Sequence, residues 1–207
     1  MRTILFLLFI LAGAALPAQT AQLAPQEDPA LTKSWEQNHR WEELQDLDGR
    51  FRLLSPATLA HVIDSVETAL GLQAYHTFHL QAPDVKQAEN VIYALSYVDY
   101  PAGTIHHDST ELVAEFFAGT EEEAAAAVGG EAVYAADKTI NGFPARQWRI
   151  DYPSRGGTAS ARTLAVVSGN RYYELKVFSR SDRGVSPSAD RFFDSLRIFA
   201  PDKEPGE

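Results

Sequence analysis

The chain has 207 residues, no cysteine and a formal net charge of −10. The lack of cysteine excludes disulfides and a lipidated N-terminal cysteine, and the acidic balance argues against nucleic acid and anionic membranes as electrostatic partners. The charge is uneven, because residues 19–130 carry 5 Lys/Arg and 18 Asp/Glu whereas residues 131–207 carry 12 and 10. Solvated faces are the simpler reading of this asymmetry, and a designed dipole is the alternative.

The first 21 residues have the pattern of a secretory signal peptide. An apolar run from Ile4 to Leu16 follows Arg2, and cleavage after Ala18 or Ala21 fits the small residues beyond it. The run has about 13 residues, fewer than the roughly 20 of a membrane span, although an uncleaved anchor is the alternative. We therefore expect a secreted or periplasmic protein with no transmembrane segment after signal cleavage.

The rest of the chain predicts one domain with two loosely structured ends. Residues 22–40 mix prolines and polar residues, which indicates a flexible linker, with a short helix near Leu31–His39 that carries Trp35. Residues 41–200 form the single domain, and residues 201–207 read as a disordered tail. We expect a monomer.

The domain begins with a predicted hairpin and a predicted helix. The hairpin runs from Trp41 to Leu54 and turns at Asp48-Gly49. Ser55-Pro56 then looks like a helix N-cap followed by proline, and Gly71 would end the helix. The helix over 56–70 is predicted from apolar residues at helical spacing, namely Leu59, Val62, Ile63, Val66 and Leu70.

Two strands and two helices follow. The strands are expected over Leu72–Gln81 and Asn90–Tyr100, the second of them an inner strand because it is apolar on both sides. A helix capped by Asp108 or Ser109 should run to about Ala118, where Gly119 ends it. The pattern Thr120-Glu121-Glu122-Glu123 is typical of a capping box and predicts a second helix to about Val128.

Two hairpins, a short helix and a last short strand complete the domain. Asn141-Gly142 joins Glu131–Ile140 to Phe143–Tyr152, and Gly169-Asn170 joins the two halves of Arg162–Phe178. Ser186-Pro187 opens a helix over 187–196, and Ile198-Phe199 could add a final strand.

The turn at Gly169-Asn170 predicts the register of its hairpin, because glycine accepts positive φ at the first central position. The predicted cross-strand pairs are Ser168 with Arg171, Val166 with Tyr173, and Leu164 with Leu175. One face then carries Leu164, Val166, Tyr173, Leu175 and Val177, and the other carries Thr163, Ala165, Tyr172, Glu174 and Lys176. The first face should meet the stripe of the helix over 56–70, and the second is either solvated or lies under the alanine-rich helices.

These elements predict an α+β fold, with hairpins forming a sheet that the helices over 56–70 and 187–196 cover. The C-terminal third carries four motifs in order: Trp148-Arg149-Ile150-Asp151-Tyr152, Arg162-Thr163-Leu164, Gly169-Asn170-Arg171-Tyr172-Tyr173-Glu174-Leu175 and Phe192-Phe193-Asp194-Ser195-Leu196. This order of motifs resembles the PsbP-like superfamily. Leu196 stands where the superfamily usually has phenylalanine, and the resemblance covers roughly residues 131–199.

The resemblance implies an α/β/α sandwich around a central antiparallel sheet of about six strands. The superfamily includes photosystem II extrinsic subunits and exported bacterial proteins, and its members mostly bind or assist other components. Because a fold does not carry a function with it, the resemblance transfers no metal or photosystem role to this chain.

The sequence offers one cluster with metal-ligand residue types, His106-His107-Asp108. A metal site needs three or four convergent ligands, so a polar loop with an aspartate N-cap is the better interpretation. The chain has no nucleophile elbow, P-loop or dinucleotide fingerprint, and Ser195 at a helix end is expected to bond backbone. We therefore expect no catalytic, cofactor or metal site, and no enzyme.

The aromatic residues on the predicted strands are the remaining functional signal. Core packing is their default role, and a binding face is the alternative. The candidate binding surface consists of Tyr97, Tyr100, Tyr172, Arg146 and Arg171. The sequence thus favours a non-catalytic module that binds a protein or envelope component. The alternatives are a carrier or sensor of a small apolar ligand held between sheet and helix, and a hydrolase with an unrecognised site.

Overall fold

The computed structural model describes residues 33–155, 157–180 and 186–199. The predicted signal peptide, most of the predicted linker and the tail lie outside these residues. The described elements in chain order are α1 (Trp35–Asn38), β1 (Glu42–Asp46), β2 (Phe51–Ser55), β3 (Ala60–Thr68), β4 (Gly71–Gln81), β5 (Ile92–Asp99), α2 (Thr110–Val128), β6 (Glu131–Ile140), β7 (Phe143–Ser154), β8 (Gly157–Ser168), β9 (Arg171–Arg180), α3 (Pro187–Asp194) and β10 (Arg197–Ile198).

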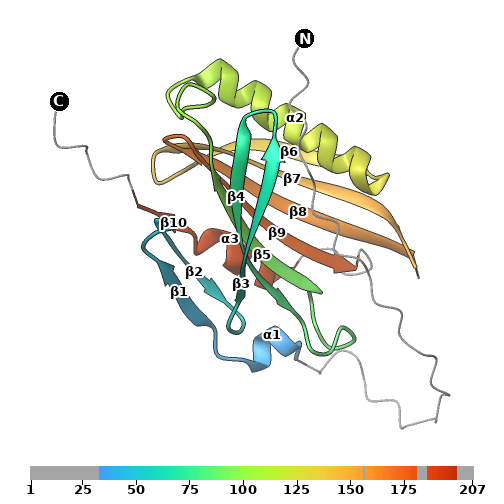
Figure 1. The fold of residues 1–207 in the computed structure, drawn as a ribbon. Helices are drawn as coiled ribbons and strands as arrows, with labels where there is room; N and C mark the ends of the chain where they lie inside the picture. The colour runs from blue at the N-terminus through green and yellow to red at the C-terminus, as the bar shows by residue number, and fades with distance from the viewer. Residues whose placement is uncertain (1–32, 156, 181–185, 200–207) are drawn as a thin grey trace, which may run out of the picture.

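The strands form two antiparallel sheets (Figure 1). The large sheet has seven strands in the order β3-β4-β5-β9-β8-β7-β6, and the small sheet has three in the order β1-β2-β10. Two of the strand pairs, β5 with β9 and β2 with β10, join segments that are far apart in sequence. The β8–β9 hairpin therefore lies near the middle of the large sheet, and β3 and β6 are its two edges.

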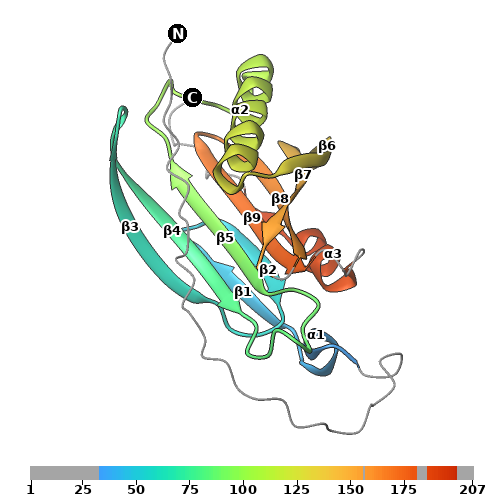
Figure 2. The ribbon, with the colours of Figure 1, turned by 90° about the vertical axis from the view of Figure 1, so that its right-hand side faces the viewer.

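Both faces of the large sheet are covered, each by a different layer. On one face the small sheet and α3 enclose a core that includes Phe51, Phe192 and Tyr173. On the other face α2 packs over a second core that includes Phe117 and Trp148. Figure 2 shows α2 and α3 on opposite sides of the large sheet. Apolar side chains on both faces of β8 and β9 follow from this arrangement.

The β8–β9 hairpin has the predicted register. Ser168 lies opposite Arg171, Val166 opposite Tyr173, and Leu164 opposite Leu175. Gly169 has φ +63°, the positive value that its place in the turn requires. The face with Tyr172 lies under α2, where the Tyr172 and Phe116 rings are 5.1 Å apart.

The prediction of a helix over 56–70 is wrong, because most of this segment forms the edge strand β3. Val62 and Ile63 lie on opposite faces of a strand that pairs with β4, and both are exposed. The helical spacing of the apolar residues was misleading, since β-branched residues are also typical of strands. Gly71 has φ +95° in the β3–β4 turn and does not end a helix. The predicted contact between a helix stripe and the β8–β9 hairpin is therefore also wrong.

The two helices predicted between 108 and 128 are one continuous helix, α2. Gly119 does not end it, and Thr120 does not cap a second helix. The Thr120 hydroxyl instead donates to the Phe116 carbonyl at 2.8 Å, a bond that competes with capping. The helix ends at Gly129, which has φ +60°.

The fold is thus mixed, as predicted, but the sandwich differs in two ways. The central sheet has seven strands instead of about six, and a three-stranded sheet shares the covering of one face with α3. The predicted hairpins at Asp48-Gly49 and Asn141-Gly142 are confirmed, and so are the helix after Ser186-Pro187 and a short last strand. Within the described ranges, no helix is long and apolar enough to cross a membrane.

Candidate functional site

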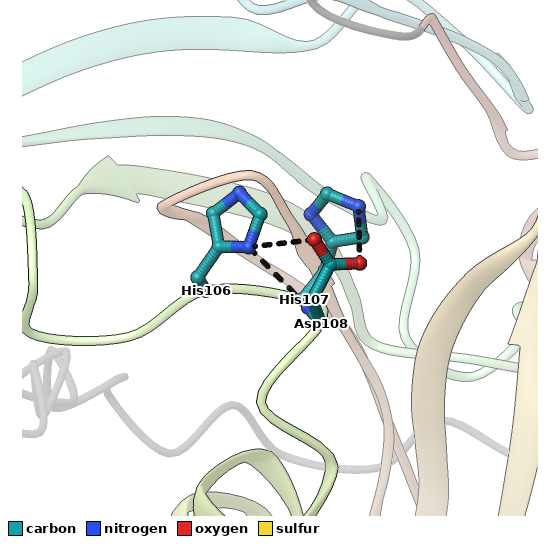
Figure 3. A group of neighbouring side chains, drawn as sticks. All are labelled: His106, His107 and Asp108. Carbon is teal, nitrogen blue, oxygen red and sulfur yellow. Dashed lines mark hydrogen bonds and ion pairs between the residues drawn. The ribbon is translucent and has the colours of Figure 1, made fainter.

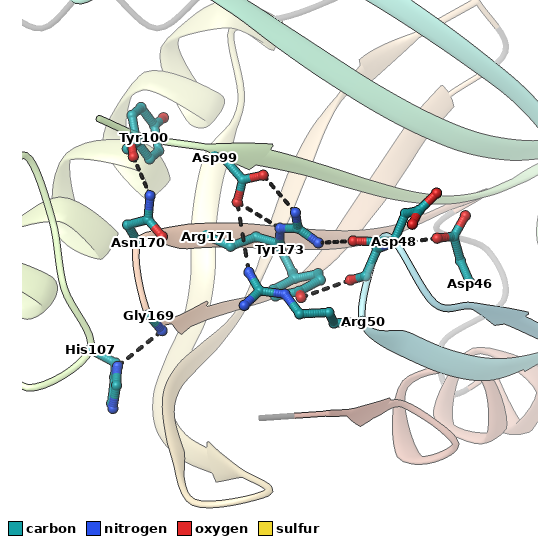
Figure 4. Close-up of polar contacts among 11 residues, drawn as sticks. Asp46, Asp48, Arg50, Asp99, Tyr100, His107, Gly169, Asn170, Arg171 and Tyr173 are labelled. Carbon is teal, nitrogen blue, oxygen red and sulfur yellow. Dashed lines mark hydrogen bonds and ion pairs between the residues drawn. The ribbon is translucent and has the colours of Figure 1, made fainter. Parts of the chain in front are cut away.

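One cluster of polar residues lies at the end of the large sheet where β5 ends and β9 begins (Figure 4). Asp99 is the last residue of β5, and Arg171 is the first residue of β9 and lies opposite it. The β1–β2 turn reaches the same place from the small sheet. Gly49 in this turn approaches so closely that an added Cβ would lie 2.6 Å from the Phe51 ring and 2.9 Å from the Tyr97 ring.

Arg171 is the centre of this cluster. Its guanidinium donates to both carboxylate oxygens of Asp99, with Nε at 2.7 Å and Nη2 at 2.5 Å, and its Nη1 donates to the Asp48 carbonyl at 2.6 Å. The same group lies over the Tyr97 ring, 4.5 Å from its centroid. Arg171 thus ties the β1–β2 turn to the large sheet, as a planar fork with several donors can do.

The electrostatics of the pair fit this structural role. Burial opposes the charge of Asp99, but hydrogen bonds from Arg171 and its positive charge outweigh that effect and hold the pKa of the carboxyl below its ordinary value. The Arg171 side chain is only 10% exposed. Its donors face Asp99 and the turn, so the pair stabilises the junction between the two sheets and offers little to a ligand.

His107 clamps the turn of the β8–β9 hairpin. Its backbone N–H donates to the Gly169 carbonyl at 3.1 Å, and the Gly169 N–H donates to His107 Nδ1 at 2.9 Å. Tyr100 supports the same turn, because its N–H donates to the Asn170 carbonyl at 3.0 Å. The loop between β5 and α2 is therefore fixed to the turn that the sequence singled out.

The hydrogen bond between the Gly169 N–H and His107 determines whether His106, His107 and Asp108 could bind a metal together (Figure 3). Their ligand atoms lie within 4.8 Å of one another, and Asp108 is 3.3 Å from His106 Nδ1 and from His107 Nε2. Because His107 Nδ1 accepts the Gly169 N–H, the proton of the neutral ring is on Nε2, which then donates toward Asp108. Only His106 and Asp108 remain, fewer than the three or four ligands of a zinc site. The triplet therefore fits a polar loop better than a metal centre.

The five residues predicted as a binding surface do not form one surface, although Arg171 lies over the Tyr97 ring. Tyr97 lies in the core under the small sheet, whereas Tyr100 and Tyr172 lie in the core under α2, and each is at most 6% exposed. Arg146 is on β7 and forms ion pairs with Glu121 at 2.9 Å and Asp137 at 2.8 Å. The three tyrosines are therefore core side chains rather than exposed ones, and any role of the five in binding stays a prediction.

A buried polar network that sequence reasoning missed fixes α1 to the domain. The Glu36 side chain accepts hydrogen bonds from the backbone N–H groups of Glu89 and Asn90, both at 2.9 Å, and from the Tyr93 hydroxyl at 3.1 Å. Glu36 is 1% exposed. A single glutamate in a polar stretch gives no signal of burial, because its partners are 53 to 57 residues away in the chain.

Glu89 extends this network to α3. Its carboxylate accepts from Ser34 at 3.0 Å, Gln37 at 2.8 Å and the Ser188 N–H at 3.1 Å. Burial opposes the charge, but the hydrogen bonds from Ser188, Ser34 and Gln37 outweigh it, so the pKa of Glu89 is lowered. Residues assigned to the linker thus belong to the folded domain from Ser34 onward.

The lowered pKa values of Glu89 and Asp99 predict acid destabilisation. A carboxyl whose pKa is lower in the folded state than in the unfolded state stabilises the fold at pH values above its unfolded pKa, which is about 4 for these groups. This contribution to the free energy of unfolding is lost as the pH falls through the folded pKa. The free energy of unfolding, measured by urea at a series of pH values, should therefore fall below about pH 4. Glu89→Gln should show a shallower fall, and equal slopes for both proteins would contradict the prediction.

A surface hollow of about 420 Å³ lies at the start of α2. Its lining residues are Ser109, Thr110, Glu111 and Leu112, all of them exposed. The hollow is therefore an open depression on one helix end and is not the space between sheet and helix that a carrier of an apolar ligand needs.

Comparison with known proteins gives a structural likeness without a sequence match. No protein-family model matches the sequence, and no curated protein matches it. A Bacteroides thetaiotaomicron protein is 14% identical with a TM-score of 0.44, covering 72% of this chain and 45% of that one. A Pseudomonas aeruginosa protein of unknown function is 11% identical with a TM-score of 0.33, covering 72% and 97%.

A likeness with a TM-score above one half is to cyanobacterial PsbP from Synechocystis sp. PCC 6803. The two are 12% identical with a TM-score of 0.51, and the match covers 86% of this chain and 99% of that one. At this identity the likeness concerns the fold alone. The resemblance inferred from the C-terminal motifs is therefore confirmed at the level of architecture: this chain has a PsbP-like fold.

Proposed function

We propose that this protein is a non-catalytic accessory module that works outside the cytoplasm by binding a protein or envelope component. The observation that carries the proposal is the contrast between its polar clusters and its apolar surface. The polar groups around Arg171, His107 and Glu36 contact one another and the backbone of the same chain. Apolar side chains are instead exposed on the β3–β4 hairpin, where Val62, Ile63 and Leu72 are 42%, 55% and 66% exposed.

Two further points support a binding role. The fold resembles that of cyanobacterial PsbP, and the resemblance to the PsbP-like superfamily implies a protein that binds or assists other components. The β3–β4 hairpin extends past β5, since β4 pairs with β5 only from His76 onward, and Leu72 lies on this projecting part. Exposed apolar groups on a projecting element are typical of interaction surfaces rather than of catalytic clefts.

Affinity capture from the native envelope tests the function. The tagged protein is expected to recover a reproducible partner after crosslinking, and an exposed-surface variant that keeps the fold, Val62→Asp with Ile63→Asp, should recover at least tenfold less. Val133→Asp on β6 is the matched control, because Val133 is also about half exposed. Recovery of no reproducible partner would contradict the binding function. Native mass spectrometry of the same preparation would reveal a small apolar ligand if the protein is a carrier instead.

A further inference from the structure

The outer edge of β3 carries Asp64 and Glu67 but lacks other devices that protect an edge strand, namely proline, basic residues and a β-bulge. Within the described residues β3 hydrogen-bonds to β4 alone, and their register is unbroken from Ala60 opposite His79 to Thr68 opposite Gly71. The strand contains no proline, lysine or arginine. Edges are usually protected by such residues or by bulges, because their free N–H and C=O groups can pair with another strand.

The opposite edge, β6, is protected in these ways. Its pairing with β7 has an irregularity between Ala132 and Tyr134, which disrupts the ladder. It also carries Lys138, and its Asp137 forms an ion pair with Arg146 on β7. Both edges belong to one sheet, so the difference between them concerns the edges themselves and not the fold as a whole.

The side chains of β3 can pack against an added strand on both faces. Val62 and Ile63 are adjacent, so they point to opposite faces of the sheet, and both are exposed. A strand beside β3 would bury these two side chains between neighbours. Figure 2 shows β3 as the outermost strand of the large sheet.

The charge of the hairpin indicates which strand would fit. Residues 60–81 contain two carboxylates, Asp64 and Glu67, and no lysine or arginine. The wider region is also acidic, with 5 Lys/Arg against 18 Asp/Glu over residues 19–130. A second copy of the chain would bring two more carboxylates and no lysine or arginine to the same edge. Opposite charges across a strand pair are stabilising and like charges are not.

We propose that β3 is a docking edge for an extended segment of a partner protein that carries both apolar and basic residues and adds to the large sheet as an eighth strand. This inference rests on the proposed binding function and names the chemistry of its partner. Main-chain hydrogen bonds to β3 provide the affinity, and the side chains opposite β3 provide the selectivity.

The register of β3 specifies a probe. An antiparallel partner needs basic residues opposite Glu67 and Asp64, and apolar residues opposite Val66, Ile63 and Val62. The acetylated and amidated heptapeptide Lys-Val-Thr-Lys-Val-Ile-Thr meets these conditions when its first residue lies opposite Glu67. The matched charge control replaces both lysines by glutamate. The matched backbone control methylates every second amide nitrogen, which blocks strand pairing without changing the charge.

The test is an NMR titration of the ¹⁵N-labelled protein at low salt, up to about 2 mM peptide, a concentration that detects affinities near −4 kcal/mol. The lysine peptide should shift the amide signals of β3 and slow their hydrogen exchange. It should bind at least tenfold more tightly than the glutamate or methylated peptide, and more weakly in about 150 mM salt. Val62→Lys with Ile63→Lys should abolish the shifts, whereas Val133→Lys on β6 should not change them. Circular dichroism confirms that the variants fold.

Three results would overturn the proposal: no change at β3, equal binding of all three peptides, or changes at β6 instead. A concentration-dependent dimer that Val62→Lys abolishes would assign the edge to a second copy and would also overturn it. A captured partner that both wild type and Val62→Lys with Ile63→Lys recover equally would leave the binding function standing and reject β3 as its site. Failure to capture any partner would contradict the proposed binding function, independently of whether the peptide binds to β3.

Discussion

Replacing Glu36 by alanine is expected to lower the free energy of unfolding by about 4 kcal/mol, because three buried donors lose their acceptor at once. Two of these donors are the backbone N–H groups of Glu89 and Asn90, and the third is the hydroxyl of Tyr93. Burial and the charge of Glu36 raise the pKa of Tyr93, so its hydroxyl keeps its proton and needs an acceptor. Equilibrium unfolding in urea at pH 7 measures the loss.

The matched variants separate the hydrogen bonds from general effects of the substitution. Glu36→Gln keeps one acceptor oxygen and should cost about half as much as the alanine variant. Glu43→Ala, at an exposed position of β1, should change the stability by less than about 0.5 kcal/mol. The loss should also appear as faster hydrogen exchange in α1 and at Asn90. An alanine variant as stable as Glu43→Ala would show that the network does not hold α1.

Turn chemistry made two hairpins of the large sheet predictable. Asn141-Gly142 and Gly169-Asn170 each predicted a hairpin that the structure confirms, and Gly169-Asn170 also predicted the register of its hairpin. The edge strand β3 was not predictable in the same way. Its apolar residues fall at helical spacing, and only its pairing with β4 decides that it is a strand. Periodicity is a weak guide for a strand that is exposed on both faces.

The candidate site was less predictable than the fold. Sequence reasoning named Arg171, but it could not place Asp99 and the Asp48 carbonyl around it, since 72 and 123 residues separate them along the chain. Tyr97 and Tyr172 were predicted to belong to a candidate binding surface, because strand alternation alone does not show which faces of the sheet other elements cover. The Tyr172 face is covered by α2, whose continuity through Gly119 the sequence did not indicate.

Replacing Arg171 by leucine is expected to lower the free energy of unfolding by about 3 kcal/mol. The Asp99 carboxylate then keeps only the longer ion pair with Arg50 at 3.7 Å, and the Asp48 carbonyl loses its donor. The substitution removes both bonds to Asp99, the bond to the Asp48 carbonyl and the contact with the Tyr97 ring. Arg171→Lys should recover less than half of the loss, because an ammonium group cannot reach the carboxylate and the turn as one planar fork does.

Arg149→Leu is the matched control for Arg171→Leu. Arg149 pairs with Asp151 two residues away on the same strand, and both side chains are partly exposed, so its loss should cost less than about 1 kcal/mol. A double-mutant cycle with Asp99→Asn should give a coupling energy of about 1–2 kcal/mol for Arg171 and Asp99. Arg171→Leu should also speed hydrogen exchange at Gly49 and Arg50, because the β1–β2 turn loses the Arg171 bond to the Asp48 carbonyl and keeps the bond from the Tyr173 hydroxyl to the Gly49 carbonyl. If Arg171→Leu and Arg149→Leu unfold at the same urea concentration, Arg171 does not stabilise the junction between the two sheets.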